Sequence, residues 1–104
     1  MFFQETLVFP SGGRSNYRIP SLAATRDGHV IAFCNDRLDT VLDHCEECDL
    51  AWAVKAPNAS WSAVKRLDRL PGWFHFIGSV VYDEMTDTLL CFFSRPCCPR
   101  AAIL

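Results

Sequence analysis

The chain lacks the features that mark several classes of protein. Its 104 residues carry 12 acidic and 10 basic side chains, and a formal net charge of -2 gives no electrostatic reason to bind nucleic acid. No apolar run approaches the roughly 18 residues that a membrane-spanning helix needs. The first residues have no basic head followed by a long apolar stretch, so no signal peptide is expected. Half of the residues are hydrophobic and 21% are charged, which is too apolar for a disordered tail.

Cysteine is abundant for a chain of this length. The chain has six: Cys34, Cys45, Cys48, Cys91, Cys97 and Cys98. Cys34 and Cys91 lie within apolar runs, where a cysteine behaves as a small hydrophobe, so buried thiols are the favoured interpretation. The alternatives are disulfides or a zinc site, the latter because Cys45 and Cys48 have ligand spacing beside His44. We assign no metal ligand. The many thiols and the missing leader favour a cytoplasmic location.

The hydrophobic pattern predicts an all-β chain. Short runs of aromatic and β-branched residues, bounded by turn residues, are typical of strands. Six strands are predicted, at 19–25, 29–35, 49–55, 62–69, 78–83 and 88–95. The Asp27-Gly28 pair predicts a hairpin turn, Asn58 is expected in a left-handed turn, and segment 38–48 is expected to be a loop. The predicted fold is therefore an antiparallel meander.

The spacing of these strands is typical of a sandwich, a barrel or a propeller. A four-stranded propeller blade takes about 40–50 residues, and four predicted strands lie within segment 19–69. The last two predicted strands would then begin a second blade. Pro96 and Pro99 interrupt the strand pattern, so the end of the chain is expected to diverge from it.

Two arginines and one aspartate are the candidate site residues. Pro20 is expected to hold Ile19 extended, which places Arg18 at the start of a strand. Arg37 lies at the end of the next predicted strand, so a hairpin would bring Arg18 and Arg37 to one edge of the sheet. Asp43 follows in the loop and could fold over that edge. This pattern predicts an anion-binding pocket with an acid beside it. The alternative is a pair of surface arginines and a solvated aspartate.

The order of these residues is similar to that of a known enzyme family. Tyr17-Arg18-Ile19-Pro20 resembles the Tyr/Phe-Arg-Ile-Pro motif of the exo-sialidases, or neuraminidases. Segment 29–33 followed by Arg37 resembles the second strand of that family, and Asp43-His44 resembles its acid/base loop. Segment 81–93 resembles the opening hairpin of a second blade. The resemblance covers most of the chain, from about residue 5 to residue 95.

This resemblance implies a six-bladed β-propeller that removes terminal sialic acid from glycoconjugates without a cofactor. Arg18 matches one of three arginines that clamp the carboxylate of the sugar, and Arg37 matches an arginine near the carboxylate and O4. Asp43 matches the general acid/base. The tyrosine nucleophile, its glutamate partner and two further arginines lie downstream in the family. The chain is therefore expected to be an N-terminal fragment that is inactive alone.

The resemblance also implies how the chain divides. The first blade would span about 17–70, the second blade would begin at about 76–95, and 96–104 would be a divergent tail. Two departures bear on this prediction. The Asp-box turn of the family, Ser-x-Asp-x-Gly-x-Thr-Trp, keeps only Ser60-Trp61, and segment 76–78 stands where many members have Asn-Pro. The alternative function is a non-catalytic carbohydrate-binding or structural propeller module, or a small cysteine-rich zinc-binding domain.

Overall fold

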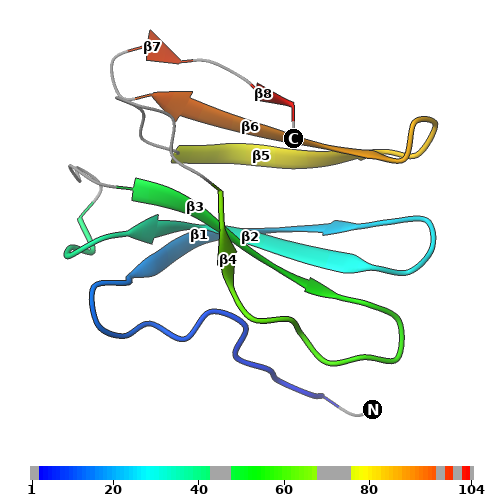
Figure 1. Ribbon diagram of the computed structural model, residues 1–104, viewed down its shortest axis with the longest axis horizontal. Coiled ribbons are helices and arrows are strands. Elements are labelled where there is room, and N and C mark those ends of the chain that lie inside the picture. The colour runs from blue at the N-terminus through cyan, green and yellow to red at the C-terminus, as the bar shows by residue number, and fades with distance from the viewer. Residues whose placement is uncertain (1–2, 43–47, 68–75, 96–97, 100–101, 104) are drawn as a thin grey trace.

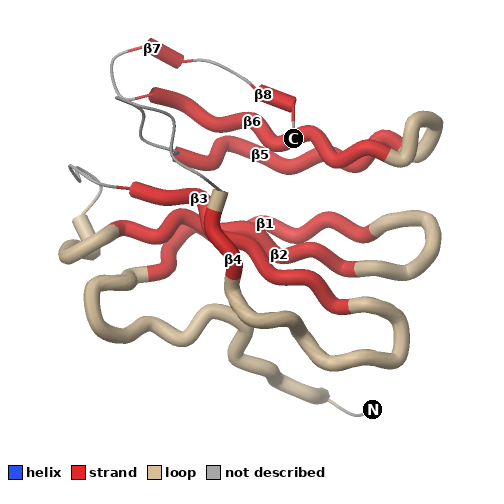
Figure 2. The backbone as a smooth tube through the Cα atoms, viewed as in Figure 1, coloured by secondary structure: helices blue, strands red, loops and turns tan. Residues whose placement is uncertain are grey.

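The chain forms two antiparallel β-layers, which lie one above the other in Figures 1 and 2. The computed structural model describes residues 3–42, 48–67, 76–95, 98–99 and 102–103. Within these ranges the chain forms strands, turns and irregular segments but no helix. The prediction of an all-β antiparallel meander is therefore confirmed.

The first layer is a four-stranded sheet in which each strand pairs with its neighbours in the sequence. Its strands are β1 (Tyr17–Ala24), β2 (Val30–Arg37), β3 (Cys48–Lys55) and β4 (Lys65–Arg66), in the order β1-β2-β3-β4. The second layer contains the hairpin of β5 (Phe76–Asp83) and β6 (Thr88–Arg95). The short strands β7 (Cys98–Pro99) and β8 (Ala102–Ile103) each pair with β6.

Five of the predicted strands begin and end within two residues of their predicted bounds, and the sixth was wrong. The strand predicted at 62–69 is reduced to β4, Lys65–Arg66. The Ser62 hydroxyl oxygen accepts a hydrogen bond from the Val54 amide at 3.0 Å, in place of a backbone carbonyl. A side chain thus replaces one backbone partner at this position, and the regular ladder with β3 begins only at Lys65.

The predicted turns form at Gly28 and Asn58. The Thr25 amide donates to the His29 carbonyl at 2.8 Å, and the Gly28 amide donates to the Thr25 carbonyl at 3.1 Å, which closes the β1–β2 hairpin. Gly28 has a φ of 92° and Asn58 has a φ of 59°, so both lie in the left-handed region. Glycine and asparagine enter this region at lower cost than other residues, which confirms both turn predictions.

The core lies between the two layers. Ile31 and Phe33 of β2 and Leu50 of β3 are buried against Cys91 of β6. Partly buried hydrophobic residues complete this cluster: Trp52, Val54, Leu67, Val80 and Leu89. Because side chains alternate across a strand, the residues between these face the opposite side of the sheet. The prediction that Cys91 is a buried core thiol is therefore confirmed.

The N-terminal segment covers part of the opposite face of the first sheet. In Figure 1 this segment runs along the side of the sheet that is turned away from β5 and β6. Thr6–Phe9 and residues of β1 and β2, including Leu22 and Cys34, line a cavity of about 320 Å³. Cys34 is buried and is a free thiol, as is Cys91, so neither forms the disulfide that was considered as an alternative.

Candidate anion-binding site

Arg18 and Arg37 converge on one carbonyl oxygen, which confirms that the hairpin brings them together. Arg18 Nη1 donates to the Val41 carbonyl at 2.6 Å, and Arg37 Nη1 donates to the same oxygen at 3.3 Å. Arg37 Nη1 also donates to the Leu42 carbonyl at 3.2 Å. Arg18 is exposed, whereas only 3% of the Arg37 surface is accessible. The two guanidinium groups therefore meet at the edge of the sheet where β1 begins and β2 ends.

The backbone at Ile19 differs from the sequence prediction. Ile19 was expected to be extended because Pro20 follows it, but its φ is 58°, in the left-handed region. The β1–β2 register shifts between Arg18, opposite Asn35, and Ser21, opposite Phe33. This β-bulge places two residues of β1 opposite one residue of β2. The bulge overrides the local preference before proline, and it puts a β-branched residue in a conformation that such residues rarely adopt.

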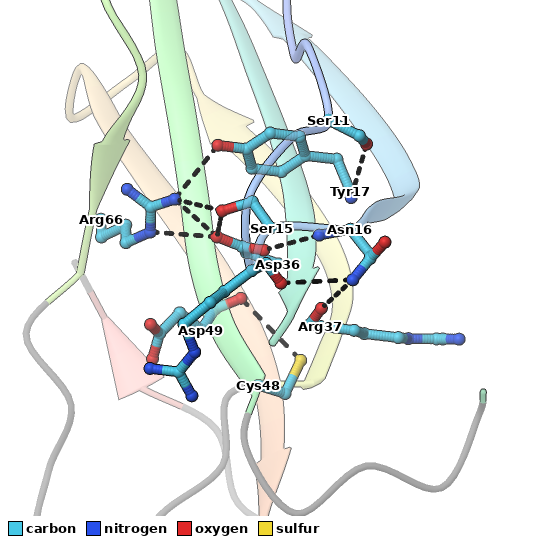
Figure 3. A network of polar contacts seen from close by, with 10 residues as sticks. Ser11, Ser15, Asn16, Tyr17, Asp36, Arg37, Cys48, Asp49 and Arg66 are labelled. Atoms are coloured by element: carbon cyan, nitrogen blue, oxygen red, sulfur yellow. Dashed lines mark hydrogen bonds and ion pairs between the residues drawn. The ribbon is translucent and has the colours of Figure 1, made fainter. Parts of the chain in front are cut away.

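A buried carboxylate precedes Arg37 in β2, on the opposite face of the sheet, and was not identified from the sequence. Asp36 has no accessible surface. Its Oδ2 accepts hydrogen bonds from Arg66 Nη2 at 2.6 Å, from Arg66 Nε at 3.0 Å and from the Ser15 hydroxyl at 2.9 Å. The Asn16 amide donates to Oδ1 at 3.2 Å. Figure 3 shows Asp36 surrounded by these donors, with Arg37 pointing away from it.

Arg66 joins Ser15 and the first residue of β1, Tyr17, to this carboxylate. Its Nη2 also donates to the Ser15 hydroxyl at 2.9 Å and to the Tyr17 hydroxyl at 3.1 Å (Figure 3). The hydrogen bonds to Asp36 raise the pKa of Arg66 above its ordinary value, which keeps the guanidinium charged. The only sequence signal was the polar run Asn35-Asp36-Arg37 at the end of an apolar strand, which does not reveal the partner thirty residues away.

Asn16 fixes the backbone that leads into Arg18. Its carbonyl accepts a hydrogen bond from the Arg37 amide at 3.0 Å. Its side-chain Nδ2 donates to the Arg37 carbonyl at 3.1 Å and to the Arg14 carbonyl at 3.2 Å. These bonds join the start of β1 to the end of β2, so the two arginines are carried by one hydrogen-bonded frame.

The turn at 38–42 supplies the carbonyl oxygens that the arginines contact. Asp39 has a φ of 63°, and its amide donates to the Arg14 carbonyl at 2.8 Å. Its carboxylate accepts from Arg14 Nη2 at 2.6 Å, and this contact lowers the pKa of Asp39 below its ordinary value. The Leu42 amide donates to the Thr40 hydroxyl at 3.1 Å. The turn is thus held by polar contacts at its start and in its middle.

Asp43, the predicted acid, lies outside the described residues, as does His44. The part of the site that the structure describes is therefore the arginine pair and the turn, and the Asp36 network lies on the other face of β2. Two guanidinium groups within reach of one oxygen can hold the two oxygens of a carboxylate through charge-assisted hydrogen bonds. The described arrangement can bind and orient an anion.

The described ranges hold only some of the residues of the zinc hypothesis, and His44 lies outside them. No group of three or more His, Cys, Asp or Glu side chains there has an arrangement that could hold a metal ion. Cys45 and Cys97 lie outside those ranges. Cys48 is buried, and its thiol contacts the Asp49 carbonyl oxygen at 3.9 Å.

A second cavity lies between the tips of the two hairpins and has the opposite charge. It measures about 530 Å³, and its polar lining includes Asp27, His29, Tyr82 and Asp87. Hydrogen bonds from Thr25 and His29 lower the pKa of Asp27 to about 2, so this carboxylate is ionised at neutral pH. An anion is favoured at the arginine pair and disfavoured here.

Comparison of the chain with protein-family models, with curated proteins and with solved structures finds no match. Among the described residues there is no helix long and apolar enough to cross a membrane.

Proposed function

We propose that this chain is the N-terminal part of an exo-sialidase in which Arg18 and Arg37 bind the carboxylate of a terminal sialic acid. The observation that supports this most strongly is the shared acceptor: both guanidinium groups donate to the Val41 carbonyl oxygen. The proposal also depends on the resemblance of Tyr17-Arg18-Ile19-Pro20 to the sialidase motif.

In this proposal the two layers are neighbouring blades of a propeller. The sheet β1–β4 is the first blade, over about 17–70, and the hairpin β5–β6 begins the second, over about 76–95. Two features support it: the first sheet is a meander of four strands in sequence order, and the next hairpin packs its apolar face onto it. Packed, radially repeated meander sheets are the construction principle of propellers.

The chemistry of the substrate suits the arginine pair. Sialic acid carries a carboxylate at neutral pH, and a guanidinium presents two donors in the plane that a carboxylate needs. Arg37 is buried, which strengthens its attraction to an anion by reducing solvent screening. Asp43 would protonate the leaving oxygen as general acid, and the family's tyrosine nucleophile would come from beyond these 104 residues.

The test measures the binding of methyl α-sialoside to the 104-residue chain. Changes in amide chemical shifts and calorimetry both report this binding. Arg18→Ala and Arg37→Ala should each weaken binding by at least tenfold, because each removes charge-assisted hydrogen bonds. Arg26→Ala removes an arginine from the far end of the hairpin and should leave affinity unchanged. The methyl ester of the sialoside, which lacks the negative charge, should not bind.

Activity provides the second arm of this test. The full-length protein should hydrolyse a fluorogenic sialoside, its Asp43→Ala variant should lose that activity, and the 104-residue chain should release no fluorophore. Turnover by the chain alone would overturn the fragment proposal. Tight binding without turnover by the full-length protein would favour the alternative, a non-catalytic sialic acid-binding module.

A further inference from the structure

The turn at 38–42 occupies the place in which an anion would contact the arginine pair. The Val41 and Leu42 carbonyl oxygens accept three hydrogen bonds from Arg18 and Arg37, at 2.6, 3.3 and 3.2 Å. The carbonyl oxygens of two consecutive residues accept hydrogen bonds from the guanidinium groups to which a carboxylate would bind. The chain thus presents to its own arginines the kind of acceptor that a ligand would present.

We infer that this turn is a built-in competitor of the anion, and that a carboxylate binds by displacing it. The inference rests on the proposed anion-binding role of Arg18 and Arg37. A carbonyl oxygen is a neutral acceptor, whereas a carboxylate carries a full negative charge, so its contact with two guanidinium groups adds a direct coulombic attraction to the hydrogen bonds. A carboxylate therefore displaces the carbonyl oxygens from the arginines, and a neutral hydroxyl of a sugar does not.

The apolar side chains of Val41 and Leu42 do little to hold the turn in place. The exposed fractions are 57% for Val41 and 65% for Leu42, so neither side chain is buried in the core. The two residues whose carbonyls contact the arginines can therefore move away without opening an apolar cavity, while Leu38 at the start of the turn is half-buried. Their exposure distinguishes these two residues from β2, whose residues from Ile31 to Arg37 are buried throughout.

The anchors that hold the turn are polar and exposed. Asp39 accepts hydrogen bonds from Arg14 Nε at 3.0 Å and from Arg14 Nη2 at 2.6 Å, and the accessible fractions of the two side chains are 59% and 61%. Such exposed pairs contribute little to stability. The Thr40 hydroxyl adds one hydrogen bond from the Leu42 amide. These contacts act as a latch that is weak enough to open when a stronger acceptor arrives.

The latch should determine the affinity of the site. When only a fraction of the molecules has an accessible site, the apparent affinity falls by that fraction, and a change that favours the open turn restores it. Asp39 and Arg14 are then affinity-determining residues although neither contacts the anion. Loosening the latch should tighten binding, whereas a turn that merely supported the arginines would give the opposite result.

The experiment measures binding of methyl α-sialoside and of acetate to the 104-residue chain and to Asp39→Gly. Glycine adopts the φ of 63° at this position without strain, so the variant removes the carboxylate and leaves the turn conformation accessible. Affinity for both ligands should rise by about three- to fivefold, the equivalent of losing one exposed ion pair. Arg14→Ala should give a similar rise, and the double variant should add little, because both changes open the same latch. Thr40→Ala removes the hydroxyl bonded to the Leu42 amide and serves as an independent second variant.

The second readout is the motion of the turn itself. At saturating sialoside, ¹⁵N relaxation should show increased mobility of the amides at 38–42, while the control turn at 83–87 stays unchanged. If Asp39→Gly binds no more tightly than the wild type while Arg18→Ala still loses affinity, the turn does not compete with the anion. The proposed function would then stand without this inference. Binding that is absent from both the wild-type chain and Asp39→Gly would overturn both proposals.

Discussion

Arg66 on β4 donates two hydrogen bonds to one oxygen of Asp36 on β2, from Nη2 at 2.6 Å and from Nε at 3.0 Å. The two strands are not neighbours, since β3 lies between them in the sheet. Asp36 is fully buried, whereas 41% of the Arg66 side chain is accessible. The exposed arginine therefore compensates a charge that has no contact with water.

Removing Arg66 should destabilise the fold strongly. Arg66→Ala leaves the buried Asp36 carboxylate with only its bonds to Ser15 and Asn16. The free energy of unfolding should fall by about 3 kcal/mol, the lower end of the range for breaking a buried pair, because Arg66 itself is partly solvated. Urea unfolding measures this.

The control is Arg14→Ala, which breaks an ion pair of similar length whose two side chains are both exposed. Its free energy of unfolding should fall by less than about 1 kcal/mol. Equal losses for the two variants would show that burial of Asp36 is not the cause.

Gly28 should tolerate no side chain. Its φ of 92° is unfavourable for any residue with a Cβ atom, and a Cβ there would lie 3.2 Å from Pro57 Cγ. Gly28→Ala should lower the free energy of unfolding by about 1–2 kcal/mol. Gly12→Ala is the matched control, because a Cβ at Gly12 meets no atom within 4 Å. Thermal unfolding of the two variants checks this prediction, which fails if their melting temperatures are equal.

The buried thiols should make the protein less stable in alkali. Burial raises the pKa of Cys34 from 9.0 to about 12 and that of Cys91 from 9.0 to about 11. Above about pH 9 the unfolded chain loses these protons and the folded chain keeps them, so the folded state binds more protons. The free energy of unfolding should then fall with rising pH by about 1.4 kcal/mol per pH unit for each thiol, until the folded pKa is reached.

Urea unfolding between pH 8 and pH 11 measures this slope. The double variant Cys34→Ala with Cys91→Ala should be less stable at pH 8 and should have a shallower slope. The same two thiols should resist iodoacetamide in the folded chain and react in denaturant, as peptide mapping by mass spectrometry would show. Rapid alkylation of Cys34 in the folded chain would contradict the burial on which both predictions depend.

The planar fork of Arg18 should matter as much as its charge. Arg18→Lys keeps the positive charge but replaces two coplanar donors by a single ammonium group. Sialoside affinity should fall by about tenfold, and salt should weaken the remaining binding more steeply because it depends on charge alone. Arg18 is exposed, so the variant should fold normally. Wild-type affinity in the lysine variant would show that no bidentate contact forms.

Local patterns predicted the hairpins well because the residues that determine them are close in sequence. The alternation of apolar residues identified five strands within two residues of their bounds, and Gly28 and Asn58 lie in the left-handed turns expected of them. The convergence of Arg18 and Arg37 was predictable for the same reason, since a hairpin necessarily brings the start of one strand to the end of the next.

The failures occurred where a residue from elsewhere in the chain changed the outcome. Ile19 adopts a φ of 58° because the β1–β2 register accommodates an extra residue, and the register is a property of both strands together. Ser62 interrupts the fourth strand by offering a side-chain oxygen to β3. Neither event has a signal in the few residues around it.

The order of residues in this chain determines its strands, its turns, its buried thiols and the arginine pair at the end of its first hairpin. The tertiary structure alone decided that Asp36 is paired with Arg66 and that the turn at 38–42 lies against the arginines. The physical reason is distance along the chain: hydrophobic periodicity and turn preference act over a few residues. A buried charge takes its partner from whichever strand the sheet brings near, and that partner is thirty residues away.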